Sequence, residues 1–76
     1  MDKLQKILNE IRPDFDFMAS NDFINDGMLD SFDIVLLVSR LEEFFDISIN
    51  GFDIVPENFR NLKSIEDLVK KSGGIL

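Results

Sequence analysis

A serine stands directly after an aspartate at the point where a loop is expected to become a helix. Residues 26–33, DGMLDSFD, lead into an apolar run that ends at Phe45. The unpaired backbone N–H groups at a helix N-terminus favour negative charge, so a phosphate ester on a hydroxyl placed there would be stabilised. We therefore interpret the Ser31 hydroxyl, next to the carboxyl group of Asp30, as the candidate attachment point of a phosphate-linked group.

Two other interpretations of these acids stay open. Aspartate and serine are both favoured as helix N-caps, and a structural cap at Asp30-Ser31 is compatible with modification. The second is a calcium loop, because positions 1, 5, 6, 9 and 12 of its twelve-residue frame are Asp22, Asp26, Gly27, Asp30 and Asp33. Ile24 at position 3 is no ligand, and the aspartate at position 12 is shorter than the usual glutamate. We expect loose binding of divalent cations to this acid cluster, but no EF-hand.

The residue types that are missing exclude several classes of enzyme. The chain contains no cysteine and no histidine, so Ser-His-Asp and Cys-His catalysis and zinc sites built on these ligands are impossible. Adjacent glutamates such as Glu42 and Glu43 on a helix surface are ordinarily solvated rather than paired for acid–base work. We expect no catalytic residue among these groups and no specific metal site.

Acidic charge is concentrated around Ser31. The net charge is −7, and residues 14–57 contain eleven acids against one base, Arg40. Such a distribution argues against nucleic acid as a partner and favours basic protein partners; the alternative is a solvated, solubilising surface. No apolar stretch is long enough to span a bilayer, and the N-terminus lacks a signal-peptide pattern. We expect a cytoplasmic protein without membrane insertion.

The position of Ser31 in the fold depends on the helices predicted before and after it. The chain has 76 residues, of which 45% are hydrophobic, as expected for one small globular domain over residues 1–76. Residues 2–12 predict an amphipathic helix, because apolar residues recur at i, i+3, i+4 and i+7 and a proline follows. Residues 13–30 predict a long connection whose phenylalanines pack onto the helices, with a turn at Asp26-Gly27.

The second predicted helix, residues 31–45, should have a buried and an exposed side. On a helical wheel the core-facing arc holds Ile34, Leu37, Val38, Leu41, Phe44 and Phe45. The opposite arc holds Phe32, Asp33, Leu36, Ser39, Arg40, Glu42 and Glu43, with Val35 at its border. Large apolar side chains on a polar face beside Ser31 predict a docking surface, unless a neighbouring loop covers them.

The rest of the chain is expected to add one short and one longer helix. Residues 46–55 predict an extended connection that turns at Asn50-Gly51 and buries Ile47, Ile49 and Phe52. Residues 56–60 predict a helical turn that begins with proline and packs Phe59 inward.

The last helix is predicted to begin with a capping-box-like pair, Ser64 and Asp67, and to end at Gly73-Gly74. The predicted fold class is therefore all-α. We expect a small four-helix bundle, with three principal helices, one short helix and a long loop between the first two helices.

The sequence around Ser31 resembles the signature of the acyl carrier protein family. Residues 22–32, DFINDGMLDSF, match its acid-rich loop with a glycine, a hydrophobic pair and Asp-Ser-hydrophobic, at the start of the second helix of a four-helix bundle. The resemblance continues through residues 41–47, LEEFFDI, and covers nearly the whole chain.

The resemblance implies a carrier protein rather than an enzyme. A phosphopantetheinyl transferase would transfer 4′-phosphopantetheine from coenzyme A to Ser31 with magnesium, and Asp30 would help to place the transferase's metal and basic groups. The arm would provide the thiol that the chain lacks and would hold a cargo as a thioester. The matching positions of the family's recognition helix are Phe32, Asp33, Leu36, Ser39, Glu42 and Glu43. Partners would be an acyl- or aminoacyl-loading ligase and downstream transferases or synthases with basic patches, visited by a monomer.

Three positions depart from carriers of fatty-acid synthesis. Those carriers usually have an acid where Leu36 stands, a methionine where Ser39 stands and another acid where Phe44 stands. The triplets Asp-Ser-Phe at 30–32 and Phe-Asp-Ile at 45–47 look more like the D-alanyl carrier protein and other stand-alone aminoacyl or peptidyl carriers. The cargo therefore stays open between acyl and aminoacyl groups. A helical interaction module without any arm is the alternative from a different class.

Overall fold

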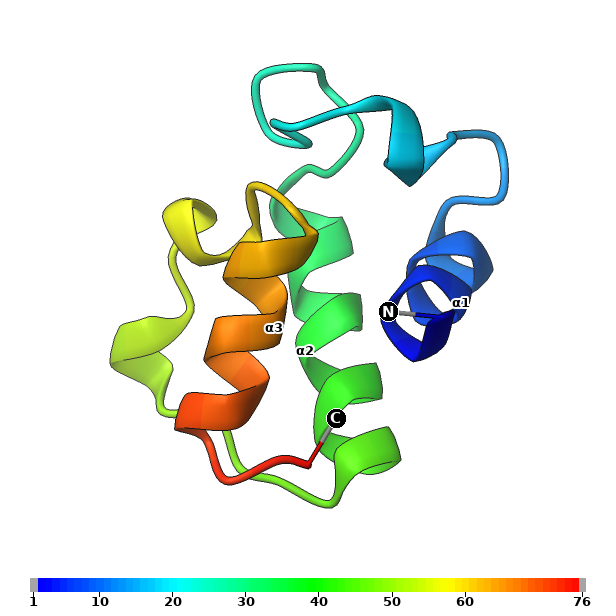
Figure 1. Cartoon of the computed structure of the whole chain (residues 1–76). Coiled ribbons are helices and arrows are strands. Elements are labelled where there is room, and N and C mark those ends of the chain that lie inside the picture. The colour runs from blue at the N-terminus through cyan, green and yellow to red at the C-terminus, as the bar shows by residue number, and fades with distance from the viewer. Residues whose placement is uncertain (1, 76) are drawn as a thin grey trace.

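Three α-helices form the framework of the protein, seen in a computed structural model that describes residues 2–75 (Figure 1). They are α1 (Asp2–Ile11), α2 (Ser31–Phe45) and α3 (Leu62–Lys71). The connections contain three short 3-10 helices, η1 (Phe17–Ala19), η2 (Gly51–Asp53) and η3 (Pro56–Phe59). No strand occurs within residues 2–75, so the prediction of an all-α fold is confirmed. In the same part of the chain, no helix is long and apolar enough to cross a bilayer.

The helix α2 lies between α1 and α3 in Figure 1, with η3 packed against α2 and α3. The core between them is apolar, and its fully buried side chains include Leu8, Phe23, Leu41, Phe59, Ile65 and Val69. The long connection after α1 contributes directly, because the buried rings of Phe17 and Phe23 meet edge to face with centroids 4.9 Å apart. The prediction that phenylalanines pack this loop onto the helices is confirmed.

Two phenylalanines lie at the surface, contrary to the sequence pattern. Phe44 is 54% exposed and lines an open surface hollow with Ile7 and Arg40 instead of entering the core. Phe52 is 92% exposed because its segment is not extended. The Asn50 side chain accepts from the Phe52 N–H at 2.9 Å and forms the η2 turn. The next residue, Asp53, pairs with Lys71 of α3 at 2.9 Å.

The N-cap of α3 is Asn61, and Ser64 is not the cap that the sequence pattern predicted. The Asn61 Oδ1 atom accepts from the Ser64 N–H at 2.8 Å, so Ser64 is the third residue of the helix. Asparagine and serine are about equally favoured as N-caps. Asn61 is the cap here because it is the last residue of the turn that follows η3.

Replacing Asn61 with alanine is therefore expected to lower the free energy of unfolding by about 1 kcal/mol, since one helix N–H loses its acceptor. Urea denaturation followed by circular dichroism measures this change. The matched variant Ser64→Ala keeps the cap and should change stability by less than half as much. A larger loss in Ser64→Ala would show that the predicted cap, not Asn61, stabilises the helix.

Candidate functional site

The candidate site is the N-terminus of α2, where Ser31 is the first helical residue and is exposed. Asp30 precedes it as the N-cap, with φ −109° and ψ −176°. Its carboxylate accepts from the Asp33 N–H at 2.9 Å, and the Asp33 carboxylate accepts from the Asp30 N–H at 3.2 Å. Because Asp30 and Asp33 make this reciprocal capping box, the cap does not engage the Ser31 hydroxyl.

The capping box keeps a negative charge beside Ser31. The hydrogen bond from the Asp33 N–H, followed by smaller contributions that include the charge of Arg12, holds the pKa of Asp30 below its ordinary value. Asp30 is itself exposed. Its carboxylate is therefore ionised at neutral pH and open to solvent, and it combines the structural role of a cap with an accessible charge beside the hydroxyl.

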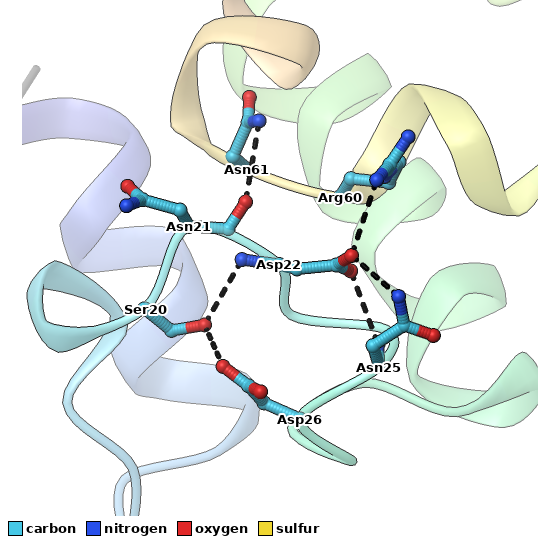
Figure 2. A network of polar contacts seen from close by, with 7 residues as sticks. All are labelled: Ser20, Asn21, Asp22, Asn25, Asp26, Arg60 and Asn61. Atoms are coloured by element: carbon cyan, nitrogen blue, oxygen red, sulfur yellow. Dashed lines mark hydrogen bonds and ion pairs between the residues drawn. The ribbon is translucent and has the colours of Figure 1, made fainter.

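The long loop before α2 is anchored to the segment before α3 by the polar network in Figure 2. The Asp22 carboxylate pairs with Arg60 at 3.2 Å and accepts from the side-chain amide of Asn25 at 2.7 Å. The backbone N–H of Asn25 is the main cause that lowers the pKa of Asp22. In the backbone, the Phe23 N–H donates to the Arg60 carbonyl at 2.6 Å, and the Met28 N–H donates to the Phe23 carbonyl at 2.8 Å. The loop that leads into Asp30 is thus fixed at several points.

The aspartates of the calcium loop considered from the sequence make contacts with other protein groups. Ser20 donates to Asp26, as Figure 2 shows, while Asp22 turns toward Arg60. Asp30 and Asp33 are used in the capping box. Within residues 2–75, no group of three acidic side chains is arranged to hold a metal ion. Gly27 serves the turn predicted at this position, with φ +72°.

The residues predicted to contact partners are the six recognition-helix positions and Val35 at their border, and five of these seven are exposed on α2. They are Phe32, Val35, Leu36, Ser39 and Glu43. Phe32 is 69% exposed, so the loops of the structure do not cover it. The apolar members lie within the first two turns of the helix, beside Ser31. An apolar surface next to the candidate attachment point is therefore present.

The two remaining members of the predicted surface have internal roles instead. Asp33 is only 4% exposed and forms an ion pair with Arg12 at 3.1 Å. Glu42 is half-buried and accepts from the Ile49 N–H at 2.9 Å, so it holds the segment after α2. The helical wheel placed both residues on the exposed arc. This placement is wrong for Asp33, which is buried, and only partly right for Glu42, which is half-buried. Arg12 was missed because nothing in its spacing relates it to a residue 21 positions later.

Comparisons of the chain with protein-family models, with curated proteins and with solved structures found no match. The site's own geometry therefore carries the functional argument: an exposed hydroxyl at the start of α2, an ionised cap before it and an apolar surface after it.

Proposed function

We propose that this protein is a carrier of the acyl carrier protein type, with 4′-phosphopantetheine attached to Ser31. The observation that carries the proposal is the exposed hydroxyl of the first residue of α2, directly after the N-cap Asp30. In this proposal η3 is the short helix of a four-helix bundle. We also propose that the carrier works as a monomer in the cytoplasm, and that its partners, not the chain itself, perform the chemistry.

The residues at the site fit such a group. A phosphodiester on Ser31 Oγ would lie at the N-terminus of a 15-residue helix, where the helix dipole favours negative charge. On modification the Ser31 oxygen gains a bond to phosphorus, the 3′,5′-ADP part of coenzyme A leaves, and the hydroxyl proton passes to the transferase. The exposed Asp30 carboxylate gives the transferase's magnesium or basic groups a negative partner beside that oxygen. The bound arm supplies a thiol to a chain that contains no cysteine.

The cargo is proposed to be an acyl or aminoacyl group held as a thioester, with the aminoacyl class favoured over fatty-acid synthesis. Leu36 and Phe44 are both exposed, where fatty-acid carriers usually present acids to their partners. Uncharged contacts at these positions support partners different from those of fatty-acid synthesis. An amino-acid adenylating ligase is the proposed loading enzyme.

The proposal is tested by intact-mass measurement. The protein is incubated with coenzyme A, magnesium and a broad-specificity phosphopantetheinyl transferase, and one phosphopantetheine increment per chain is expected. An unchanged mass on a sample that circular dichroism shows to be folded would contradict the proposal. That result would favour an interaction module that uses the exposed side chains of Phe32, Val35 and Leu36.

Shortening Leu36 to alanine is expected to raise the transferase's KM for the carrier roughly tenfold with little change in kcat, because an apolar docking contact is lost while Ser31 stays in place. Initial rates at varied carrier concentration measure both constants. Val55→Ala is the matched control, since Val55 is 38% exposed and Leu36 is 40% exposed, but Val55 lies off α2. Equal KM values for the two variants would contradict docking on α2.

A further inference from the structure

The capping box at Ser31 is linked to α1 by an ion pair between the buried Asp33 and the partly buried Arg12. Asp33 is the only charged residue that is buried in the part of the chain that the structure describes. Its Oδ2 atom accepts from Arg12 Nη1 at 3.1 Å, and the same atom accepts from the Asp30 N–H at 3.2 Å. One carboxylate oxygen thus connects Arg12, just beyond α1, to the backbone of the residue before Ser31.

The Arg12 guanidinium is held from several sides. The Arg12 N–H donates to the Leu8 carbonyl at 2.9 Å, which continues the hydrogen bonding of α1 by one residue. The guanidinium carbon lies 4.9 Å from the centroid of the Phe15 ring, and Nε is 3.6 Å from the Asp14 carboxylate. A planar, many-donor cation held in this way fixes an acceptor more closely than a lysine ammonium does.

The burial of the Asp33 carboxylate in this pair requires an explanation beyond stability. A buried ion pair stabilises a fold little compared with apolar residues of similar volume, because both charges lose their hydration. In this capping box two carboxylates lie close together, and the charge of Arg12 offsets their repulsion. Removing the guanidinium leaves the Asp33 carboxylate buried without its cation. The capping box, and with it the Asp30-Ser31 backbone, then loses its fixed geometry.

We propose that Arg12 is a positioning residue for Ser31: its ion pair with Asp33 holds the Asp30-Ser31 backbone in the conformation that presents the hydroxyl for modification. This inference rests on the proposed function. Arg12 acts through Asp33 and contacts neither the arm nor the transferase. Its effect is therefore expected on the rate of the chemical step and not on docking, which uses the outer face of α2.

The test compares four chains in the phosphopantetheinylation assay: wild type, Arg12→Leu, Arg12→Leu with Asp33→Asn, and Arg40→Leu. Arg12→Leu is expected to lower kcat by between about tenfold and a hundredfold, with the KM for the carrier unchanged, because small misplacements of a reacting group have effects of this size. In the double variant the side-chain amide oxygen still accepts from the Asp30 N–H but carries no charge, so most of the loss should be recovered. Arg12→Lys should fall between wild type and Arg12→Leu.

Arg40→Leu is the matched control, because Arg40 also joins α2 to α1, through Glu10 at 2.7 Å, but at the surface. Its kcat should equal that of wild type. All rates are measured at a temperature at which circular dichroism shows every variant to be folded. Amide hydrogen exchange at Asp30 and Asp33 gives a readout that needs no transferase, and both amides should exchange faster in Arg12→Leu.

The outcomes of this test distinguish the positioning role of Arg12 from the proposed carrier function. A folded Arg12→Leu chain with wild-type kcat and wild-type exchange at Asp30 and Asp33 overturns the positioning role of Arg12 and leaves the carrier function intact. A loss in kcat that only follows the unfolded fraction, or that the double variant does not recover, also overturns it. A wild-type chain that is never modified overturns the carrier function, and the inference with it.

Discussion

Replacing Ser31 with alanine is expected to abolish both the phosphopantetheine increment and all subsequent loading of cargo. In the proposed reaction a bond forms to the Ser31 oxygen, so no residual rate is expected when that oxygen is removed. Folding should be unaffected, because Asp30 and Asp33 make the capping bonds and alanine is favourable in a helix. Intact mass measures the increment, and loading is measured by offering the modified protein to an amino-acid adenylating ligase.

Ser48→Ala is the matched control for this experiment, because Ser48 is exposed but lies beyond the end of α2 and outside the predicted docking surface. This variant should gain the full increment. An increment that persists in Ser31→Ala, or one that is lost in Ser48→Ala, would contradict the assignment of the arm. Loading by a fatty-acyl enzyme alone would leave the carrier function in place and remove the preference for an aminoacyl cargo.

Replacing Phe23 with alanine is expected to lower the free energy of unfolding by about 3–5 kcal/mol, the usual range for truncating a fully buried aromatic side chain. Phe23 is 0% exposed, its ring packs edge to face against that of Phe17, and its backbone N–H donates to the Arg60 carbonyl. The whole free energy of unfolding of a domain of 76 residues is roughly 4–11 kcal/mol. The expected loss is therefore a large part of the free energy of unfolding, and urea denaturation and the thermal midpoint measure it.

Phe52→Ala removes the same side chain from the surface and is expected to change stability by less than about 0.5 kcal/mol. The comparison tests the finding that Phe52 is exposed rather than buried, as the alternating pattern of residues 46–55 suggested. Similar losses in the two variants would mean that Phe52 packs into the core and that the η2 turn is misplaced.

The local features of the site could be predicted from the sequence. The α2 helix begins at Ser31 and ends at Phe45, as its apolar spacing indicates, and Asp30 caps it. These features depend on neighbouring residues, since a cap and its acceptor lie within one turn. The buried positions of Ile34, Leu37, Val38 and Leu41 follow from the same spacing.

Two of the features that the sequence did not predict depend on residues far apart in the chain. A helical wheel assigns Asp33 to the polar face because it ignores the guanidinium that Arg12 brings from the end of α1. It assigns Phe44 to the core, whereas Phe44 lines a surface hollow together with Ile7 of α1. The third feature is local: the Asn50 side chain accepts from the Phe52 N–H, and this hydrogen bond competes with the extended pattern and leaves Phe52 exposed.

The most direct test of the carrier function locates the modification on the chain. Trypsin does not cleave the Arg12-Pro13 bond, so residues 7–40 of the transferase-treated protein are released as one peptide that contains three serines, Ser20, Ser31 and Ser39. Fragmentation of this peptide is expected to place the whole phosphopantetheine increment on Ser31. An increment on Ser20 or Ser39, or a peptide without any increment, would contradict the attachment of the arm at the start of α2.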